Sequence, residues 1–276
     1  MNRSISSLLM LACLFSTSAC RPTPEQYTDL GPRVIDSAGI QSILIQVDYG
    51  EVVLLESDDS HVRIDGQVLY VDELEYQLNS TEQQISITIF SHQDNLSRAP
   101  LKTVIRLPQN KQVEVETDNA SVLVQGYQGD VEIASTSGDI KLEQTTGKLT
   151  LRSNRGRITV QESSGLVSVV GNYGALTLQN VSGEVAASAI MGNIVFSGLI
   201  QQGDVVRLET DHGSVSVNMS TDSALGIQVR STSGDVTCIL PGISSTTRTC
   251  DGAMNSGGGS LSIRTVSGAV TLQLIP

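Results

Sequence analysis

The stretch VEIASTSGDIKLEQTTGKLTLRSNRGRITVQESSG, residues 131–165, divides into units of nine that resemble one another: VEIASTSGD, IKLEQTTGK, LTLRSNRGR and, with Leu166 as its ninth residue, ITVQESSGL. In each unit the first and third residues are apolar, the second is polar, and the eighth is glycine. Side chains at i and i+2 of a β-strand point to the same face, so each unit predicts a short strand with one apolar face. Glycine accepts a positive φ, which allows the chain to turn after each strand.

The nine-residue pattern extends well beyond this stretch. It begins at Val113 and runs through nine units without an insertion. Spacing is looser after Ile194, and the units LSIRTVSGA and VTLQLIP close the chain. Residues 238–259 interrupt the pattern and predict a loop excursion. The eighth residue is glycine in every unit except the first, which has alanine: Gly129, Gly138, Gly147, Gly156, Gly165, Gly174, Gly183 and Gly192.

Two units make a coil of about 18 residues, and stacked coils pair each strand in parallel with the strand one coil later. One coil buries about four aliphatic side chains at roughly 1.5–3 kcal/mol each, which does not offset its ordering entropy, whereas a stack of coils does. We therefore predict an all-β fold: a single parallel β-solenoid, right-handed and β-helix or β-roll-like, with nine-residue half repeats. The expected inner columns are Val131, Leu149, Val167 and Val185 on one wall, and Val122, Ile140, Ile158, Leu176 and Ile194 on the other.

Four segments are expected along the chain. Residues 1–19 carry Arg3 and an apolar run over residues 8–15 that is too short to span a bilayer, as in a secretory signal peptide. Residues 20–37 predict a tether, and residues 38–110 an irregular N-terminal β region or cap. Residues 111–276 form the solenoid repeats.

Cysteine positions give two predictions. Cys20 follows Ser18 and Ala19, which resembles a bacterial lipobox, although Thr17 stands where leucine is preferred. That resemblance implies acylation of Cys20 and membrane attachment through the lipid; the alternative is an ordinary secreted chain cleaved after Ala19. An exported chain meets oxidising conditions, so Cys238 and Cys250 predict a disulfide, whereas a metal or redox pair lacks supporting histidine or CxxC spacing.

Composition excludes several function classes. The net charge of −12, without a basic run, argues against nucleic-acid binding. None of the three histidines lies in a nucleophile or zinc motif, and no cofactor is expected. The aspartates after the corner glycines do not form the repeated pattern of a calcium β-roll. Instead, Asp130 and Lys148, and likewise Asp139 and Arg157, would lie one coil apart as solvated surface pairs.

The segment TVIRLPQNKQVEVETDNASVLVQGYQGDVEIASTSGDIKLEQTTGK carries further signals: Leu107-Pro108 ends an extended strand, and STSGDI and STSGDV occur at residues 135–140 and 231–236. In these features the chain resembles a bacterial β-strand-repeat family of unknown function labelled "putative adhesin". The resemblance covers roughly residues 38–274. It implies an envelope-associated parallel β-solenoid, and it supplies no catalytic residue.

Three functional hypotheses follow. The first is an envelope lipoprotein, on the outer side of the cytoplasmic membrane or at the cell surface, whose rigid β-solenoid is a non-catalytic adhesion module for an unknown protein or glycan. The second is a structural or regulatory envelope protein that self-associates through an open end, because the last strand, VTLQLIP, has no helix to cap it. The third is a carbohydrate-active enzyme, which is disfavoured because the carboxylates are scattered and aromatic residues are few.

Overall fold

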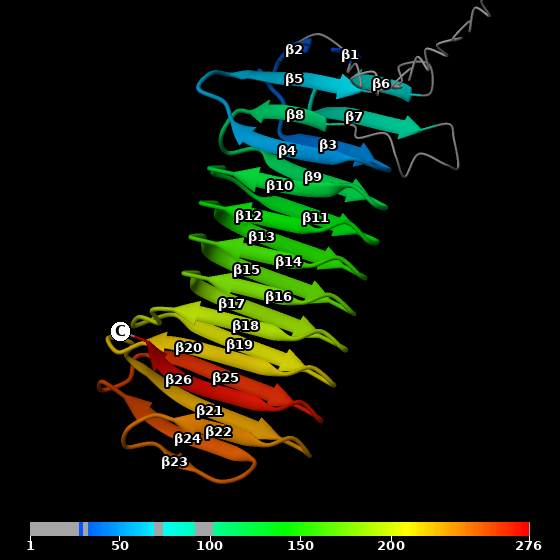
Figure 1. The fold of residues 1–276 in the computed structure, drawn as a ribbon. Helices are drawn as coiled ribbons and strands as arrows, with labels where there is room; N and C mark the ends of the chain where they lie inside the picture. Colours follow the sequence, from blue (N-terminus) through cyan, green and yellow to red (C-terminus); the bar gives the residue numbers. More distant parts are fainter. Residues whose placement is uncertain (1–27, 30–32, 69–73, 92–101, 276) are drawn as a thin grey trace, which may run out of the picture.

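The computed structural model describes residues 28–29, 33–68, 74–91 and 102–275. These residues form strands and turns and no helix, which confirms the all-β prediction. The strands build two large sheets that face each other and run the length of an elongated stack (Figure 1). Most neighbouring strands within each sheet are parallel.

Sheet A has the strand order β1 (Thr28–Asp29), β5 (His61–Val68), β8 (Lys102–Leu107), β4 (Glu51–Glu56), β10 (Ser121–Gln125), β12 (Ile140–Glu143), β14 (Ile158–Gln161), β16 (Leu176–Gln179), β18 (Ile194–Gly198), β20 (Val215–Ser220), β26 (Val270–Ile275) and β22 (Val236–Ile239), with β2 (Arg33–Asp36) also on β5. Sheet B has the order β23 (Ser244–Ser245), β24 (Thr249–Met254), β21 (Leu225–Ser231), β25 (Gly259–Thr265), β19 (Val205–Thr210), β17 (Ser182–Ala189), β15 (Ser164–Gly171), β13 (Thr146–Ser153), β11 (Val131–Ser135), β9 (Gln112–Thr117), β3 (Ser42–Val47), β7 (Gln84–Ser91) and β6 (Leu74–Ser80). Chain segments alternate between the sheets, and one strand from each makes a layer of the stack.

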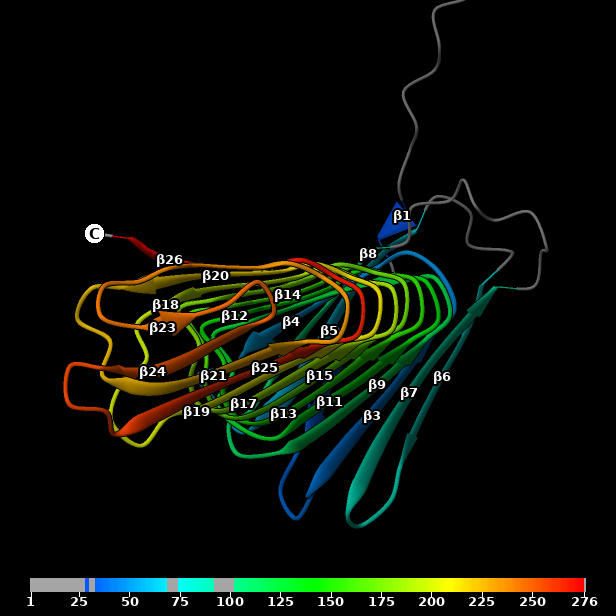
Figure 2. The ribbon, with the colours of Figure 1, turned by 90° about the horizontal axis from the view of Figure 1, so that it is seen from below.

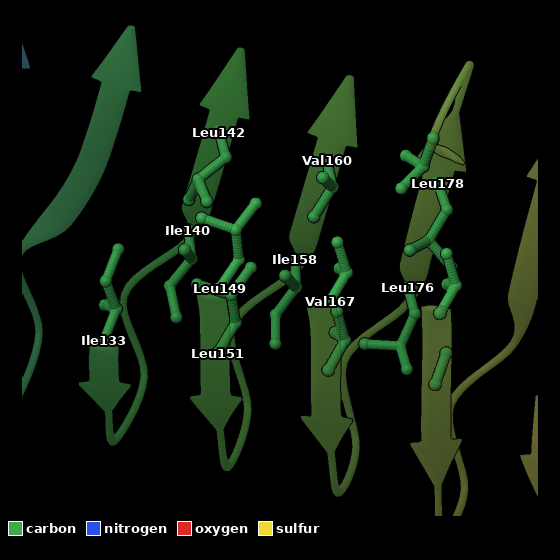
Figure 3. Close-up of a cluster of buried hydrophobic side chains, with 14 of the residues drawn as sticks. Ile133, Ile140, Leu142, Leu149, Leu151, Ile158, Val160, Val167, Leu176 and Leu178 are labelled. Carbon is green, nitrogen blue, oxygen red and sulfur yellow. The ribbon is translucent and has the colours of Figure 1, made fainter. Parts of the chain in front are cut away.

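The core lies between the two sheets and consists of aliphatic columns. In sheet B, Val131 lies opposite Leu149, which lies opposite Val167 in the next layer. In sheet A, Ile140 lies opposite Ile158 in the same way. All five side chains are buried, and Figure 3 shows Leu149 and Val167 together with Ile140 and Ile158 in the space between the two sheets. The predicted inner columns are confirmed.

A column of buried hydroxyl groups lines the corner where the chain leaves sheet B. Ser153 is a typical member: its Oγ accepts a hydrogen bond of 2.8 Å from the backbone N–H of Gly156. Thr210, Thr265 and Ser231 cap their own corners in the same way. A short hydroxyl side chain thus satisfies a corner amide that the β-ladder leaves without a partner.

Close approach between layers requires glycine at all eight of the predicted glycine corners, and positive φ is an added reason at only half of them, so the prediction from positive φ is wrong for the other half. At Gly147 φ is +142°, a conformation that side chains with a Cβ rarely adopt. Gly156 lacks a positive φ, but a Cβ there would lie 2.0 Å from the carbonyl oxygen of Gly138 in the neighbouring layer. Close approach between layers therefore requires glycine at this corner. Gly129, Gly165 and Gly183 share the positive φ, and a Cβ at these corners would also lie within 2.8 Å of a backbone carbonyl oxygen. Gly138, Gly174 and Gly192 have the close approach alone.

The aspartates after these glycines do not form the predicted charge pairs. Asp130 Oδ1 accepts a hydrogen bond of 3.0 Å from the backbone N–H of Lys148. Asp139 accepts one of 2.7 Å from the backbone N–H of Arg157. The carboxylates therefore join one corner to the backbone of the next, because the amide lies nearer than the cationic side-chain end.

At the N-terminal end the layers do not follow the order of the chain. Strands β3 and β4 form a layer next to that of β9 and β10. On their other side lies the layer of β7 and β8, although these two strands follow β3 and β4 in the sequence. Antiparallel strands then finish both sheets, with β6 on β7 and β5 on β8. Most of the described part of residues 38–110 therefore continues the stack. Seen along the stack, the strands fan progressively, as expected from strand twist (Figure 2).

The C-terminal end corrects two predictions. Residues 238–259 do not form a plain loop excursion, since β24 pairs antiparallel with β21 and β23 pairs with β24. The last strand, β26, is not at an open end, because it lies between β20 and β22, while β25 lies between β19 and β21. Figure 1 shows this as red strands between yellow and orange ones.

Candidate binding groove

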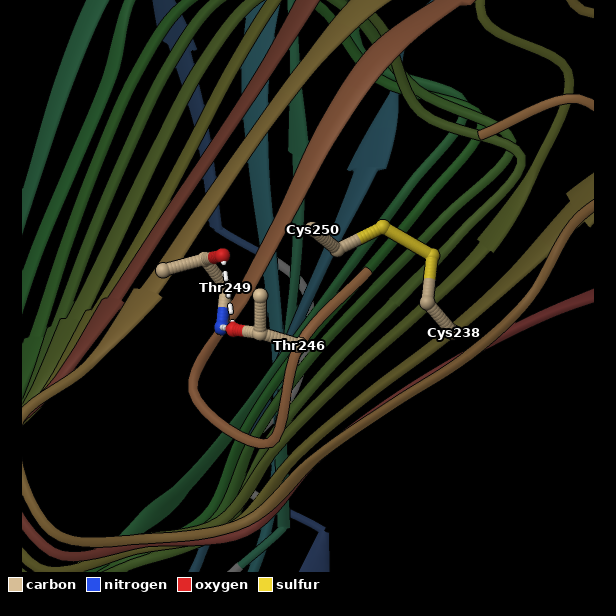
Figure 4. Close-up of a disulfide and its surroundings, with 4 residues drawn as sticks. All are labelled: Cys238, Thr246, Thr249 and Cys250. Carbon is tan, nitrogen blue, oxygen red and sulfur yellow. Dashed lines mark hydrogen bonds between the residues drawn. A yellow bond between two sulfur atoms is a disulfide. The ribbon is translucent and has the colours of Figure 1, made fainter. Parts of the chain in front are cut away.

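The predicted disulfide is present at the C-terminal end of the stack. Cys238 in β22 is bonded to Cys250 in β24, with 6.3 Å between their Cα atoms, and Cys250 is fully buried. The disulfide links β22, the outermost strand of sheet A at this end, to β24 of sheet B. Thr246 and Thr249 close the turn beside it (Figure 4). Cys20, the predicted lipidation site, lies outside the described residues.

The contacts at His61 do not follow a nucleophile–base arrangement. At His61, the nearby Asp59 carboxylate accepts the Ser57 hydroxyl at 3.1 Å, and His61 Nδ1 lies 3.6 Å from the same carboxylate. The serine proton is therefore directed to Asp59 and not to the imidazole, contrary to the nucleophile–base arrangement. His212 contacts the Ser267 hydroxyl at a corner, and His92 lies outside the described residues.

Local hydrogen bonds explain the electrostatics of Asp59. The backbone N–H of His61 donates to its Oδ1 at 3.0 Å and is the main reason that the pKa of Asp59 is lowered. The Ser57 hydroxyl and the Arg63 guanidinium act in the same direction. Asp59 thus stabilises the turn between β4 and β5 as a carboxylate.

Two of the three aromatic side chains in the repeats are internal. Tyr127 is fully buried, and its hydroxyl donates to the carbonyl oxygen of Lys111 at 2.8 Å. Burial raises the pKa of Tyr127. Phe196 is also buried, so among the described aromatics of the repeats Tyr173 alone is largely exposed.

The described ranges contain neither a cluster of metal-binding side chains nor a membrane-spanning helix. No three or more His, Cys, Asp or Glu side chains among these residues lie close enough together to hold a metal ion. The same part of the chain contains no long apolar helix of the kind that crosses a bilayer.

A hollow on the described surface, here called the corner groove, has a volume of about 530 Å³. It lies where strands of sheet B end and turn toward sheet A, and it crosses six layers, from β7 to β15. Two columns of outward-facing residues flank it, because i and i+2 of each strand point to the same side. One column is Gln46, Glu116, Ala134, Arg152 and Val170; the other is Phe90, Asp48, Asp118, Thr136, Asn154 and Asn172.

A smaller hollow of about 200 Å³ continues the groove toward β19 and shares Val170 and Asn172 with it. Ile190 lies in this extension and is 46% exposed. Beside it, at the same corners, are Tyr173 and Met191, which are 59% and 57% exposed. Val170, Tyr173, Ile190 and Met191 are thus exposed apolar side chains at successive corners of this end, while Glu209 and Asp211 line the smaller hollow at the layer of β19.

The opposite end of the groove is acidic. Glu116 accepts a hydrogen bond of 2.7 Å from Gln46, and Asp118 accepts one of 3.2 Å from Thr136. Asp48 belongs to the same end. Arg152, the cation of the lining, is paired at 2.8 Å with Glu132 outside the groove. Carboxylates thus dominate the charge at this end, beside the 38% exposed ring of Phe90.

The groove was not among the features predicted from the sequence, although a signal was present. The repeat normally has polar residues at its fourth, sixth and seventh positions. Units VSVVGNYGA and VAASAIMGN instead carry Val170, Tyr173, Ile190 and Met191 there. Apolar residues on the outward positions of a repeat indicate a contact surface, because the core does not require them.

Known proteins provide an independent comparison. Among curated proteins, none matches this sequence. The solved structures similar to it include a "putative adhesin" from Bacteroides fragilis, with a TM-score of 0.45 and 12% identity over 90% of this chain and 98% of that one. A "putative adhesin" from Parabacteroides distasonis has a TM-score of 0.42 and 10% identity, covering 91% and 98%. A "putative cell adhesion protein" from Clostridium sporogenes has a TM-score of 0.33 and 9% identity, covering 91% and 100%.

The family assignment rests on a direct sequence match. The profile described as Toastrack DUF4097 matches residues 40–273, which span the stack from its N-terminal layers into β26. The resemblance noted from Leu107-Pro108 and the STSGD repeats is thereby confirmed. The chain belongs to the Toastrack DUF4097 family.

Proposed function

We propose that the protein is an envelope lipoprotein that presents a rigid β-solenoid as a non-catalytic adhesion or binding module. The observation that carries the proposal is the corner groove, an open hollow of about 530 Å³ on a scaffold of paired strands. Ligand sites in proteins commonly occupy roughly 300–1,000 Å³, and their walls mix apolar and polar groups as this groove does. Catalysis would in addition need converging acid, base or nucleophile groups, which the described lining lacks.

The scaffold in this proposal is one continuous solenoid. Val131, Leu149 and Val167 face one another in successive layers, and the bond from the Lys148 amide to Asp130 spans one such layer step of 18 residues, which supports coils of that length. Ile194 and Val215 also face each other in successive layers, but here the step is longer. The hydrogen bond from the Ser214 amide to the Asn193 side chain at the same corner spans 21 residues. One coil therefore carries a small insertion. We take the coil to be right-handed, as parallel crossovers generally are.

Attachment to the membrane is the second part of the proposal. Cys20 would carry the lipid after removal of residues 1–19, and residues 20–37 would separate the membrane from the stack. The module would then stand on the outer side of the cytoplasmic membrane or at the cell surface. The intramolecular disulfide supports export, because such bonds persist in oxidising compartments.

Cell fractionation with protease shaving tests the attachment. The native chain is expected in the membrane fraction and a Cys20→Ala variant in the soluble or secreted fraction. Removal of the native chain by protease added to intact cells would support surface display. Protection until the envelope is opened would rule out adhesion and leave an internal envelope role. An unchanged distribution of the variant would refute lipidation at Cys20.

A further inference from the structure

The corner groove has two chemically different ends at a fixed separation, and this limits what it can bind. We propose that it binds an extended polypeptide segment that carries a lysine or arginine and, about four residues away, a large apolar side chain. The inference rests on the proposed binding function and specifies its ligand. The ligand would lie across the strands, along the axis of the stack.

The shape of the groove favours a chain over a compact molecule. Its two flanking columns repeat in every layer from β3 to β15, and the smaller hollow prolongs it to β19. Ala134 is the smallest side chain of the first column and leaves the centre of the groove open. A long hollow with walls on two sides accepts an extended segment whose side chains enter at intervals.

The acidic end supplies recognition of a cation. Asp48, Glu116 and Asp118 line the hollow within two neighbouring layers. Phe90 lies in the next layer, at the same end, and offers an exposed aromatic face. Carboxylates bind lysine or arginine directly, and an aromatic ring adds a cation–π contact. The same carboxylates would repel an anionic glycan or an acidic peptide.

The apolar end supplies the second contact. Val170 lines the corner groove, Ile190 lines the smaller hollow together with Glu209 and Asp211, and Tyr173 and Met191 add exposed apolar surface at the same corners. An aliphatic or aromatic side chain placed here would remove apolar area from water on both partners. Apolar anchors with a polar surround are the usual centres of binding energy in protein interfaces.

The distance between the ends sets the spacing of the ligand residues. Three layer steps separate Asp118 in the β9 layer from Val170 in the β15 layer. At about 4.8 Å per step this is about 14 Å, which an extended peptide covers in about four residues at roughly 3.4 Å each. A cationic residue at i and an apolar residue at i+4 would therefore reach the two ends together.

The test uses the mature chain and fluorescently labelled nine-residue peptides in a polarisation assay. One peptide has lysine at position 3 and leucine at position 7, with serine and glycine elsewhere. A second has the same composition with lysine and leucine adjacent, and a third has glutamate in place of lysine. We expect saturable binding of the first peptide, weaker as salt is raised, and weak or no binding of the others.

Variants locate the binding on the groove. Glu116→Gln combined with Asp118→Asn should weaken the Kd of the first peptide by about tenfold or more at low salt, because two charge contacts are lost. Asp222→Asn removes an exposed charge elsewhere and should leave the Kd unchanged. Ala134→Trp should fill the groove and abolish binding, whereas Thr159→Trp, on the outer face of sheet A, should not. Circular dichroism and unfolding midpoints confirm that each variant folds.

The outcomes separate this inference from the proposed function. Equal binding of the three peptides, or a Kd unaffected by Glu116→Gln with Asp118→Asn, would overturn the inference. If instead a neutral oligosaccharide bound and Ala134→Trp blocked it, the binding function would stand and the polypeptide ligand would be wrong. If neither peptides nor oligosaccharides bound, the inference would fall and the groove would no longer support the proposed function.

Discussion

Replacing Gly156 with alanine is expected to destabilise the stack through a clash between layers. The added Cβ would lie 2.0 Å from the carbonyl oxygen of Gly138, where a carbon–oxygen contact normally needs more than about 3.2 Å. The two corners must therefore separate by about 1 Å or more. Gly174 in the next layer approaches the carbonyl oxygen of Gly156 just as closely, so a shift of the Gly156 corner would also disturb that layer.

The size of the destabilisation by Gly156→Ala can be estimated from the hydrogen bonds that hold these layers together. The N–H of Arg155 donates to the carbonyl oxygen of Thr136 at 3.1 Å, and the N–H of Ile140 to that of Arg157 at 2.8 Å. A separation of about 1 Å takes both beyond hydrogen-bonding distance, at about 1 kcal/mol each. Overpacking adds about 1–3 kcal/mol. The expected loss in the free energy of unfolding is about 3–5 kcal/mol.

Urea unfolding followed by circular dichroism measures this loss, and hydrogen exchange of the 154–158 amides locates it. Gly226→Ala is the matched control, because its Cβ would meet no atom within 4 Å and its φ is not positive. The control should be neutral or stabilising by up to about 1 kcal/mol. A Gly156→Ala variant within about 0.5 kcal/mol of the control would refute the argument from close approach.

Four other predictions follow from single contacts. Ser153→Ala should lower the free energy of unfolding by about 1–2 kcal/mol, because it leaves a corner amide without its acceptor; thermal unfolding against the native chain measures this. Replacing Cys238 and Cys250 together with alanine should cost about 2–3 kcal/mol and raise hydrogen exchange in β24 while β13 keeps its protection. Glu162 has a φ of +49°, so Glu162→Asn should stabilise the chain by about 0.5–1 kcal/mol in urea unfolding. The pKa of Asp59 is lowered in the folded state, so its contribution is present above about pH 4 and lost as the pH falls through the folded value; Asp59→Asn should reduce the fall of the unfolding midpoint in that window.

The sequence was sufficient for the parts of the fold that depend on local pattern. Alternation of apolar residues predicted the inward columns, of which Leu149 and Ile158 are typical, and cysteine usage predicted the disulfide. The cause of the corner glycines was only half predicted, because a close approach between layers cannot be read from one unit. The groove was missed for a similar reason: its walls come from strands in six layers and become neighbours only in the stack.

The order of the layers was not predictable from the repeat. Strands β21 and β25 both place aliphatic residues inward, and Ser231 and Thr265 cap their corners alike. Either strand would fit beside β19, so periodicity does not distinguish them. Contacts outside the repeat do: the disulfide joins β22 to β24, and Asn255 donates to the carbonyl oxygens of Thr221 and Ser223. These tie residues 221–255 together as an outer layer, and β25 and β26 occupy the space inside it.

This order changes the expectation for self-association. An open parallel edge would invite strand addition from another copy, and the last strand was predicted to supply it. Because β26 is internal, the edge of sheet A at that end is the short strand β22, and the N–H of Val236 already donates to the carbonyl oxygen of Thr247. Sheet B ends there in the antiparallel strands β24 and β23, and the opposite ends of both sheets are antiparallel too. At the C-terminal end little backbone therefore remains for growth among the described strands, whereas β6 (Leu74–Ser80) is the outer strand of sheet B at the opposite end. The structure thus argues against self-association through the C-terminal end, and the corner groove on the side of the stack remains the proposed contact.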